Sequence, residues 1–147
     1  MNEAKGSKEL RERIRILERK LGVLDDFQTS CCSITLAQCN ALVEIGRAEN
    51  ISLNELSGLL NIESSSMSRT VNNLVNNNLA KRDIDTIDRR YVTITLTESG
   101  NKLFKIIEES MDDYFAKIYN ALPIDKREQV LDSLQILLAV IGENGCC

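Results

Sequence analysis

The sequence predicts a mainly α-helical fold that carries one small β-hairpin. Apolar residues recur at helical spacing through most of the chain, and only one proline and seven glycines interrupt its 147 residues. Residues 91–96 instead alternate with the two-residue period of a strand, and residues 80–84 are predicted to form the strand before it. We expect a single domain, residues 1–147, which is long enough to bury a core without disulfides or metals.

A long first helix is predicted to end near Cys31 and Cys32. It carries five aliphatic residues at 4-3-4-3 spacing: Leu10, Ile14, Leu17, Leu21 and Leu24. This heptad pattern is typical of a helix that packs on one partner helix. An ordinary core-facing stripe within a monomer gives the same pattern, so both interpretations stay open.

Two shorter helices should follow, each with its own capping signals. The segment Thr35–Gln38 has the pattern of a capping box for a helix that runs to about Arg47. The segment Ser52–Glu55 has the pattern of a second capping box, and Asn61 can take the left-handed conformation that ends this helix.

Residues 64–77 are predicted to form a fourth helix with two chemically different faces, ended by a left-handed Asn78. Serines 64–66 offer N-cap oxygens. Met67, Val71 and Leu74 have the i, i+4, i+7 spacing of a core face. The outward face then holds Ser64, Ser65, Ser66, Ser68, Arg69, Asn72 and Asn73. Small side chains let a helix enter the major groove, arginine can donate two bonds to guanine, and asparagine can pair with adenine. A solvated helix rich in asparagine is the alternative.

A hairpin should come next, with strands at 80–84 and 91–96 joined by the polar segment 85–90. Two short helices, a turn and a hairpin are the order of a winged helix-turn-helix. Arg89 and Arg90 would lie at the tip, where long cations can reach a minor groove. Asp85 and Asp88 can orient them through charge-assisted bonds. An ordinary hairpin with surface charges is the alternative.

Two helices should complete the chain. Thr97-Glu98 opens a long one that Pro123 breaks, and Asp125–Glu128 has the pattern of a third capping box for the last helix. Heptad spacing relates the aliphatic residues of that helix, Val130, Leu134, Leu137 and Ile141, and Gly142 and Gly145 are expected to end it.

Successive motifs in this order resemble the MarR family of transcriptional regulators. They are Thr35-Leu36-Ala37-Gln38, Ser52-Leu53-Asn54-Glu55-Leu56, Ser65-Ser66-Met67-Ser68-Arg69, Leu79-Ala80-Lys81-Arg82, Asp88-Arg89-Arg90 and Leu96-Thr97-Glu98-Ser99-Gly100. The resemblance implies a winged helix-turn-helix at 34–97 and dimerisation helices at 8–32 and 98–142. It also implies a homodimer that binds a pseudo-palindromic operator on double-stranded DNA, usually as a repressor released by a ligand or an oxidant. Asn78 stands where such proteins usually have glycine, and asparagine tolerates that backbone.

Charge and composition exclude some classes of function but do not identify the function. The net charge is −4. Residues 52–97 hold five basic side chains (Arg69, Lys81, Arg82, Arg89, Arg90) and five acidic ones (Glu55, Glu63, Asp83, Asp85, Asp88), so charge alone does not point to nucleic acid. The absence of histidine removes the Ser-His and Cys-His catalytic pairs, and we expect no enzyme. With no apolar membrane span and no signal peptide, the chain is expected to be cytoplasmic.

The five cysteines are the least determined feature. Cys31, Cys32 and Cys39 lie close in sequence, and Cys146 and Cys147 close the chain. Such thiols can bind a soft metal or metalloid ion, although no cofactor is certain, and thiol oxidation is the nearest rival. Cys39 can instead be a small core residue, and the terminal pair a disordered end. A protein-interaction or metalloid-buffering module that has lost DNA binding is the alternative function.

Overall fold

The computed structural model describes residues 2–32, 34–84, 86–88, 90 and 92–143; of residues 23–32 and 143 it describes only the backbone. The chain divides into two compact units, residues 1–107 and 108–147. Helix α5 (Glu98–Ala121) begins in the first unit and ends in the second. No helix in the described ranges is both long and apolar enough to cross a membrane.

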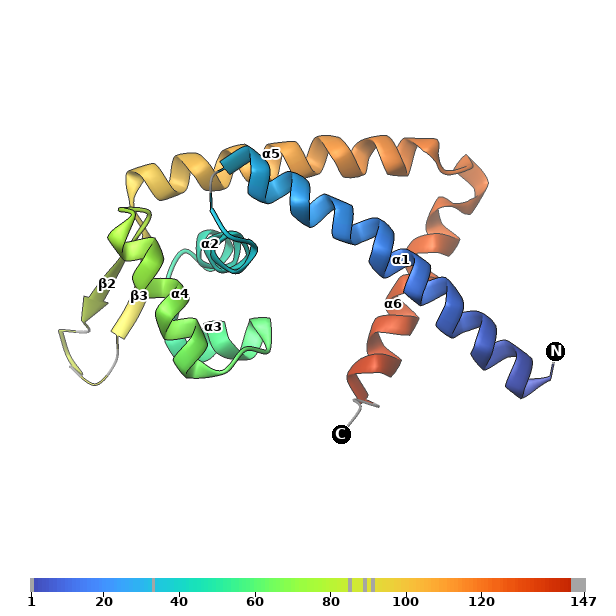
Figure 1. The fold of residues 1–147 in the computed structure, drawn as a ribbon, viewed down its shortest axis with the longest axis horizontal. Coiled ribbons are helices and arrows are strands. Elements are labelled where there is room, and N and C mark those ends of the chain that lie inside the picture. The colour runs from blue at the N-terminus through green and yellow to red at the C-terminus, as the bar shows by residue number, and fades with distance from the viewer. Residues whose placement is uncertain (1, 33, 85, 89, 91, 144–147) are drawn as a thin grey trace. The chain divides into compact units, whose positions relative to one another are not determined.

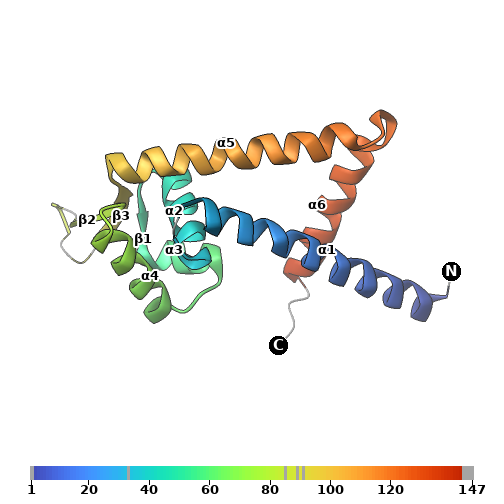
Figure 2. The same cartoon turned by 45° about the horizontal axis from the view of Figure 1, so that its top comes forward.

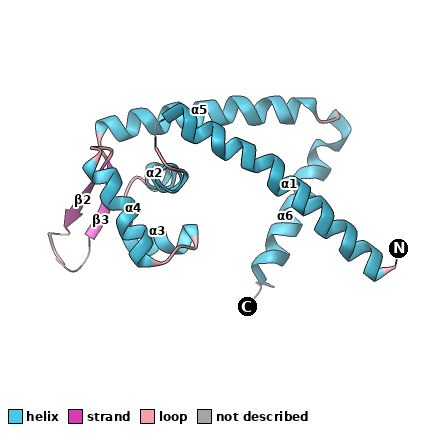
Figure 3. Ribbon diagram, viewed as in Figure 1, coloured by secondary structure: helices cyan, strands magenta, loops and turns pink. Residues whose placement is uncertain are grey.

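The first unit follows the predicted order of helices and strands (Figure 1). After the long α1 (Glu3–Cys32) come α2 (Leu36–Ala48), β1 (Ile51–Ser52), α3 (Leu53–Leu60), α4 (Ser64–Asn76), β2 (Ala80–Ile84) and β3 (Val92–Leu96). Helix α4 packs against both α2 and α3, and α1 contacts α2. These contacts make a three-helix core next to one small sheet, whose strands stand out in Figure 3.

The sheet has three antiparallel strands in the order β1-β3-β2 (Figure 2). The predicted hairpin is confirmed, with Ala80 opposite Leu96 and Ile84 opposite Val92. Strand β1 was not predicted. It is only two residues long, Ile51 pairing with Ile94 and Ser52 with Thr93, which is too short to show an alternating pattern. It ties the start of α3 to the hairpin.

The core lies between α2, α3, α4 and the sheet. Met67, Val71 and Leu74 are fully buried, which confirms the predicted inner face of α4. The other fully buried residues on α2 and α3 are Cys39, Ala41, Leu42, Ile45 and Leu56. Complete burial of a leucine or isoleucine side chain contributes about 1.5–3 kcal/mol, so this cluster holds α4 firmly in place.

Most of the predicted cap residues behave as expected. The amide of Gln38 donates to Thr35 Oγ1 at 3.2 Å and the amide of Thr35 donates to the Gln38 side chain at 3.4 Å, which confirms the first capping box. Ser52 accepts from the amide of Glu55 at 3.1 Å. Asn61 and Asn78 have φ values of 52° and 58°, so both take the expected left-handed conformation.

The predicted N-cap of α4 is wrong. The extended residue before the helix is Glu63, and no side-chain oxygen caps this terminus. Ser64, the first of the three serines, already has helical backbone and therefore cannot be the cap. The first turn of α4 is thus left with amide groups that no side chain caps.

In the second unit, the end of α5 is followed by the 3₁₀ turn η1 (Ile124–Lys126) and α6 (Arg127–Glu143). Asp125 lies inside η1, so its predicted role as an N-cap is wrong. Pro123 ends α5 as expected. Arg127 instead stabilises this corner, because its guanidinium donates to the carbonyls of Leu122 at 3.3 Å and Asn120 at 3.2 Å and lies 4.9 Å from the Tyr119 ring centre.

Candidate nucleic-acid interface

Helix α4 presents a polar face directly opposite its buried face. Of the seven residues predicted for this face, six are exposed and Ser68 is half-buried: Ser64, Ser65, Ser66, Arg69, Asn72 and Asn73 are the exposed ones. With the inner face fully buried, the rotation of α4 about its axis is fixed. Arg69, Asn72 and Asn73 therefore project from the unit as one set of hydrogen-bonding side chains.

The start of α4 suits an anion. Three exposed serine hydroxyls lie on a helix terminus that lacks a side-chain cap. The first-turn amides, which the N-cap side chain does not bond, and the positive end of the helix dipole favour negative charge at this position. A phosphate placed there would supply the acceptors that the sequence of α4 does not.

The turn between α3 and α4 is short and well defined. Asn61 ends α3 in the left-handed conformation, and its amide donates to the carbonyl of Gly58 at 3.4 Å. The amide of Ile62 donates to the carbonyl of Ser57 at 3.1 Å. These bonds satisfy the last carbonyls of α3 and fix the angle at which α4 leaves. The α3–turn–α4 unit is therefore a helix-turn-helix, as predicted.

At the tip of the hairpin, Asp88 forms an ion pair with Arg90. The guanidinium of Arg90 donates to Asp88 through Nε at 3.0 Å and Nη2 at 2.8 Å, and the Arg90 amide donates to the same carboxylate at 3.1 Å. These hydrogen bonds lower the pKa of Asp88 below its ordinary value of 3.8 and raise that of Arg90. The predicted orienting role of Asp88 is confirmed for Arg90, whereas Asp85 and Arg89 lie outside the described residues.

Arg90 also lines a recess of about 290 Å³ beside the first turn of α3, together with Ser52, Leu53, Asn54 and Val92. Strand β1 brings these residues together, because it pairs with β3 immediately before α3 begins. The unexpected third strand thus joins the hairpin tip and the helix-turn-helix into one surface.

With this geometry in place, the sequence of residues 34–92 matches the sequence model of the MarR family. This segment is a MarR family domain. It includes α2, α3, α4 and most of the hairpin. No curated protein sequence matches the chain.

Solved structures of MarR proteins share the fold of the chain. FabT from Streptococcus pneumoniae, determined in complex with DNA, is 16% identical, with a TM-score of 0.86 over 93% of this chain and 98% of that one. A MarR family protein from Bacillus stearothermophilus is 21% identical, with a TM-score of 0.84 over 97% and 99%. MepR from S. aureus, also determined with DNA, is 22% identical, with a TM-score of 0.74 over 88% and 96%. Members of the MarR family are transcription regulators and not enzymes, which agrees with the expectation from the sequence.

The MarR domain is anchored to α5 by a compact junction. Thr97 Oγ1 donates to the carbonyl of Asn78 at 2.7 Å, and its amide donates to the carbonyl of Leu79 at 3.1 Å. The same hydroxyl accepts from the amide of Gly100 at 3.0 Å, which caps α5. A Cβ atom on Gly100 would overlap the carbonyl oxygen of Leu79, so only glycine fits at this position. The junction fixes the base of the hairpin relative to the end of α4.

The cysteines predicted to sense a soft ion are only partly within the described structure. Cys39 is fully buried on α2, which favours the interpretation that it is a small core residue. The side chains of Cys31 and Cys32 lie outside the described residues, as do Cys146 and Cys147. No group of three or more potential metal ligands occurs among the side chains that the structure describes.

Two exposed hydrophobic side chains that the sequence did not predict at the interface also lie on the hairpin. Ile84 and Ile87 are 62% and 95% exposed. From the sequence, their hydrophobicity would suggest that they are buried. They face solvent because this part of the hairpin extends beyond the core. The exposed Lys81 and Arg82 on β2 were counted in the charge balance but not assigned to the interface.

Proposed function

We propose that the protein is a dimeric, sequence-specific DNA-binding transcriptional regulator. The observation that carries this proposal is the polar face of α4, fixed opposite a fully buried stripe in a MarR domain. Helix α4 enters the major groove, where Arg69 reads guanine and Asn72 or Asn73 reads adenine. The serines at the start of the helix bind phosphate.

The hairpin supplies a second contact in the minor groove. Arg90 is held by Asp88 before DNA arrives, so little side-chain entropy is lost when it binds. We expect Arg89 to act alongside it. This contact adds affinity for any duplex, since the minor groove distinguishes bases poorly.

Electrostatics contribute less here than in a basic DNA-binding protein. Residues 52–97 hold equal numbers of basic and acidic side chains, and the whole chain has a net charge of −4. Few phosphates are neutralised, so affinity should fall only shallowly as salt rises. Base contacts from α4 therefore carry a large share of the binding.

The test compares Arg69→Ala with Arg90→Ala on an operator selected from random duplexes. Arg69→Ala should weaken operator binding by about 1–3 kcal/mol and relax the preference at one base position. Arg90→Ala should weaken binding to all duplexes and reduce the slope of affinity against salt.

Arg13→Ala is the matched control, because Arg13 is an exposed arginine on α1 whose ion pair is with Glu9 of its own helix, at 2.6 Å. If Arg69→Ala and Arg90→Ala bind DNA as tightly as Arg13→Ala, the DNA-binding proposal is wrong. The chain is then better explained as an interaction or metalloid-buffering module on the same fold.

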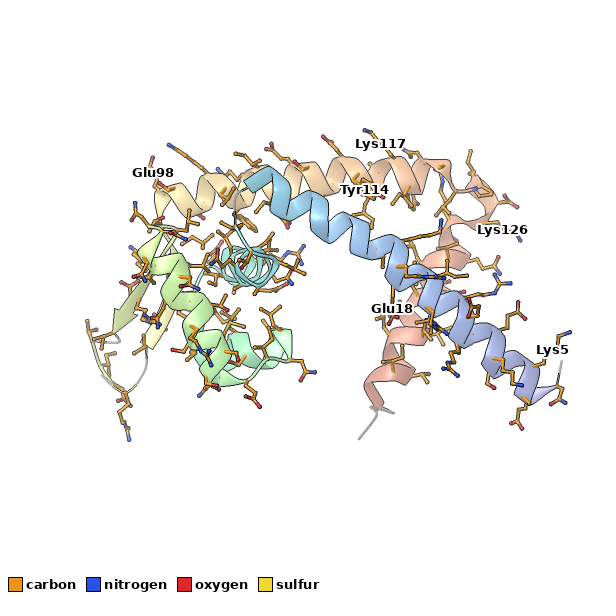
Figure 4. All side chains as sticks on the ribbon, viewed as in Figure 1. Lys5, Glu18, Glu98, Tyr114, Lys117 and Lys126 are labelled. Carbon is orange, nitrogen blue, oxygen red and sulfur yellow. The ribbon has the colours of Figure 1, made fainter. Side chains whose placement is uncertain are left out.

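The apolar surface that the protomer leaves exposed supports the proposed homodimer. On α1 the residues Leu10, Leu17 and Leu21 are 40–49% exposed, and α6 exposes the aliphatic side chains Leu131, Leu134, Ile136, Leu138, Val140 and Ile141. A soluble monomer rarely exposes large apolar patches of this kind. Charged side chains occupy other positions on α1, as Figure 4 shows for Lys5 and Glu18.

Sedimentation should give twice the chain mass of 16.5 kDa. A soluble species of 16.5 kDa at micromolar concentration would contradict the dimer.

We further propose that DNA binding represses transcription and that an effector relieves it. Support for this comes from the family resemblance alone. The effector can be a soft metal or metalloid ion, an oxidant or a small organic ligand. Operator binding measured with each class of effector decides among them.

A further inference from the structure

The hairpin carries two large aliphatic side chains that the fold does not bury. Ile84 is 62% exposed at the end of β2, and Ile87 is 95% exposed in the connection to β3. Hairpin connections usually hold glycine, asparagine, aspartate or serine, because these residues adopt turn conformations and remain solvated. Single exposed isoleucines are common on protein surfaces, but these two lie three residues apart on one projecting element.

The position of Ile84 follows from the geometry of the sheet. Ala80 and Ile84 lie on the same face of β2, because side chains two and four residues apart share a face. Ala80 is buried at 3% exposure, whereas Ile84, paired with Val92, lies beyond the reach of the core. Arg82 lies between them on this face and is exposed, so Ile84 is an exposed apolar side chain beyond a cation and not the end of a continuous apolar face. Figure 1 shows the hairpin running beside α4, with its tip at the end away from α5.

The charged residues beside these isoleucines indicate which partner the isoleucines contact. Arg90 leaves its side chain 88% exposed while Asp88 holds it at 2.8 Å. A cation in this state suits a polyanion, and apolar groups beside it suit the deoxyribose walls and base faces of a minor groove. A hydrophobic protein partner would have to cover Arg90 and Asp88 as well, at a cost in desolvation.

We propose that Ile84 and Ile87 form an apolar wedge that enters the minor groove beside Arg90 and partly unstacks one base step. This proposal rests on the proposed DNA-binding function and adds a determinant of specificity to it. Ile87 enters the groove more deeply, because it is the more exposed of the two. Ile84 packs next to it, closer to the core of the domain. Pyrimidine–purine steps unstack most easily, so the wedge selects such a step at a position that no hydrogen bond reads.

The wedge also explains how a domain with little positive charge gains affinity. Apolar burial is independent of salt, unlike phosphate contacts. Removing the isoleucine at the tip should therefore lower affinity equally at low and high salt. Removing Arg90 should change the salt dependence instead.

The experiment uses the full chain and an operator selected from random duplexes, with 2-aminopurine placed in turn at each step of the wing-contact region. Fluorescence anisotropy measures affinity, and 2-aminopurine emission reports unstacking. Ile87→Ser is the test variant and Ile87→Leu is the matched control that keeps the apolar volume. Both changes are at an exposed position and should leave the thermal midpoint unchanged.

Ile87→Ser should bind at least tenfold more weakly, which corresponds to about 1.4 kcal/mol, with an unchanged salt slope and no 2-aminopurine signal. Ile87→Leu should retain the affinity and the signal. If Ile87→Ser binds the operator as well as the native protein, the wedge is refuted while the proposed function stands, and the apolar tip is then a protein contact. If the native protein selects no DNA at all, the proposed function and the wedge both fail.

Discussion

Gly100→Ala should destabilise the protein although it replaces glycine within a helix. Such a change ordinarily stabilises an exposed helix by about 0.8–1 kcal/mol. Here the new Cβ overlaps the carbonyl oxygen of Leu79 and lies 2.9 Å from its carbonyl carbon and 3.3 Å from Leu96 Cβ. Those neighbours are backbone and core, so the end of the hairpin must move away from α5.

That movement breaks the hydrogen bonds from Thr97 to Asn78 and Leu79, which measure 2.7 Å and 3.1 Å. The two bonds contribute about 1 kcal/mol each, and overpacking adds about 1–3 kcal/mol. After the helical gain is subtracted, we expect a net loss of about 2–4 kcal/mol in the free energy of unfolding.

Urea denaturation at one fixed protein concentration measures the loss, since a dimer's stability depends on concentration. Gly58→Ala is the matched control, because Gly58 lies in α3 and a Cβ added there would meet no atom within 4 Å. It should gain up to about 1 kcal/mol. If Gly100→Ala is as stable as Gly58→Ala, the proposed role of this junction is wrong.

Three further outcomes are expected. Ser57→Ala should be neutral or stabilising by up to about 1 kcal/mol in thermal unfolding, because Ser57 is 8% exposed and its hydroxyl has no hydrogen-bond partner in the described part of the chain. Asp88→Ala should weaken binding to all duplexes by releasing Arg90. In the native protein the Asp88 pKa is lowered by Arg90, so the pair forms above that pKa and breaks only as pH falls through it; affinity should not change for this reason between about pH 6 and pH 8. Trivalent arsenic, antimony or cadmium should release the native protein from its operator under reducing conditions but not a Cys31/Cys32→Ser variant; release by peroxide alone would identify oxidation instead.

The sequence predicted the order of the helices and the hairpin because local signals specify them. The capping box at Thr35 and the left-handed residues Asn61 and Asn78 act through neighbours in the chain, so no tertiary information is needed to find them. The inner face of α4 followed from periodicity in the same way, since Met67, Val71 and Leu74 lie on one side of any helix.

Other features depend on contacts between distant residues. Strand β1 exists because Ile51 meets Ile94 across the sheet, and two residues carry no pattern of their own. Glu63 rather than a serine precedes α4, because the turn after Asn61 sets where helical backbone begins. The exposure of Ile87 depends on how far the hairpin extends beyond the core. None of these has a local sequence signature.

If the proposed function is right, α4 reads the major groove of a two-fold symmetric operator. Selection from random duplexes, followed by hydroxyl-radical footprinting and repeated with Arg69→Ala, tests this directly. We expect two protected half-sites whose centres lie about one helical turn, or a small multiple of it, apart, with Arg69→Ala losing the preference for one base pair in each. Recovery of no consensus sequence by the native protein, or an identical consensus from Arg69→Ala, would contradict it.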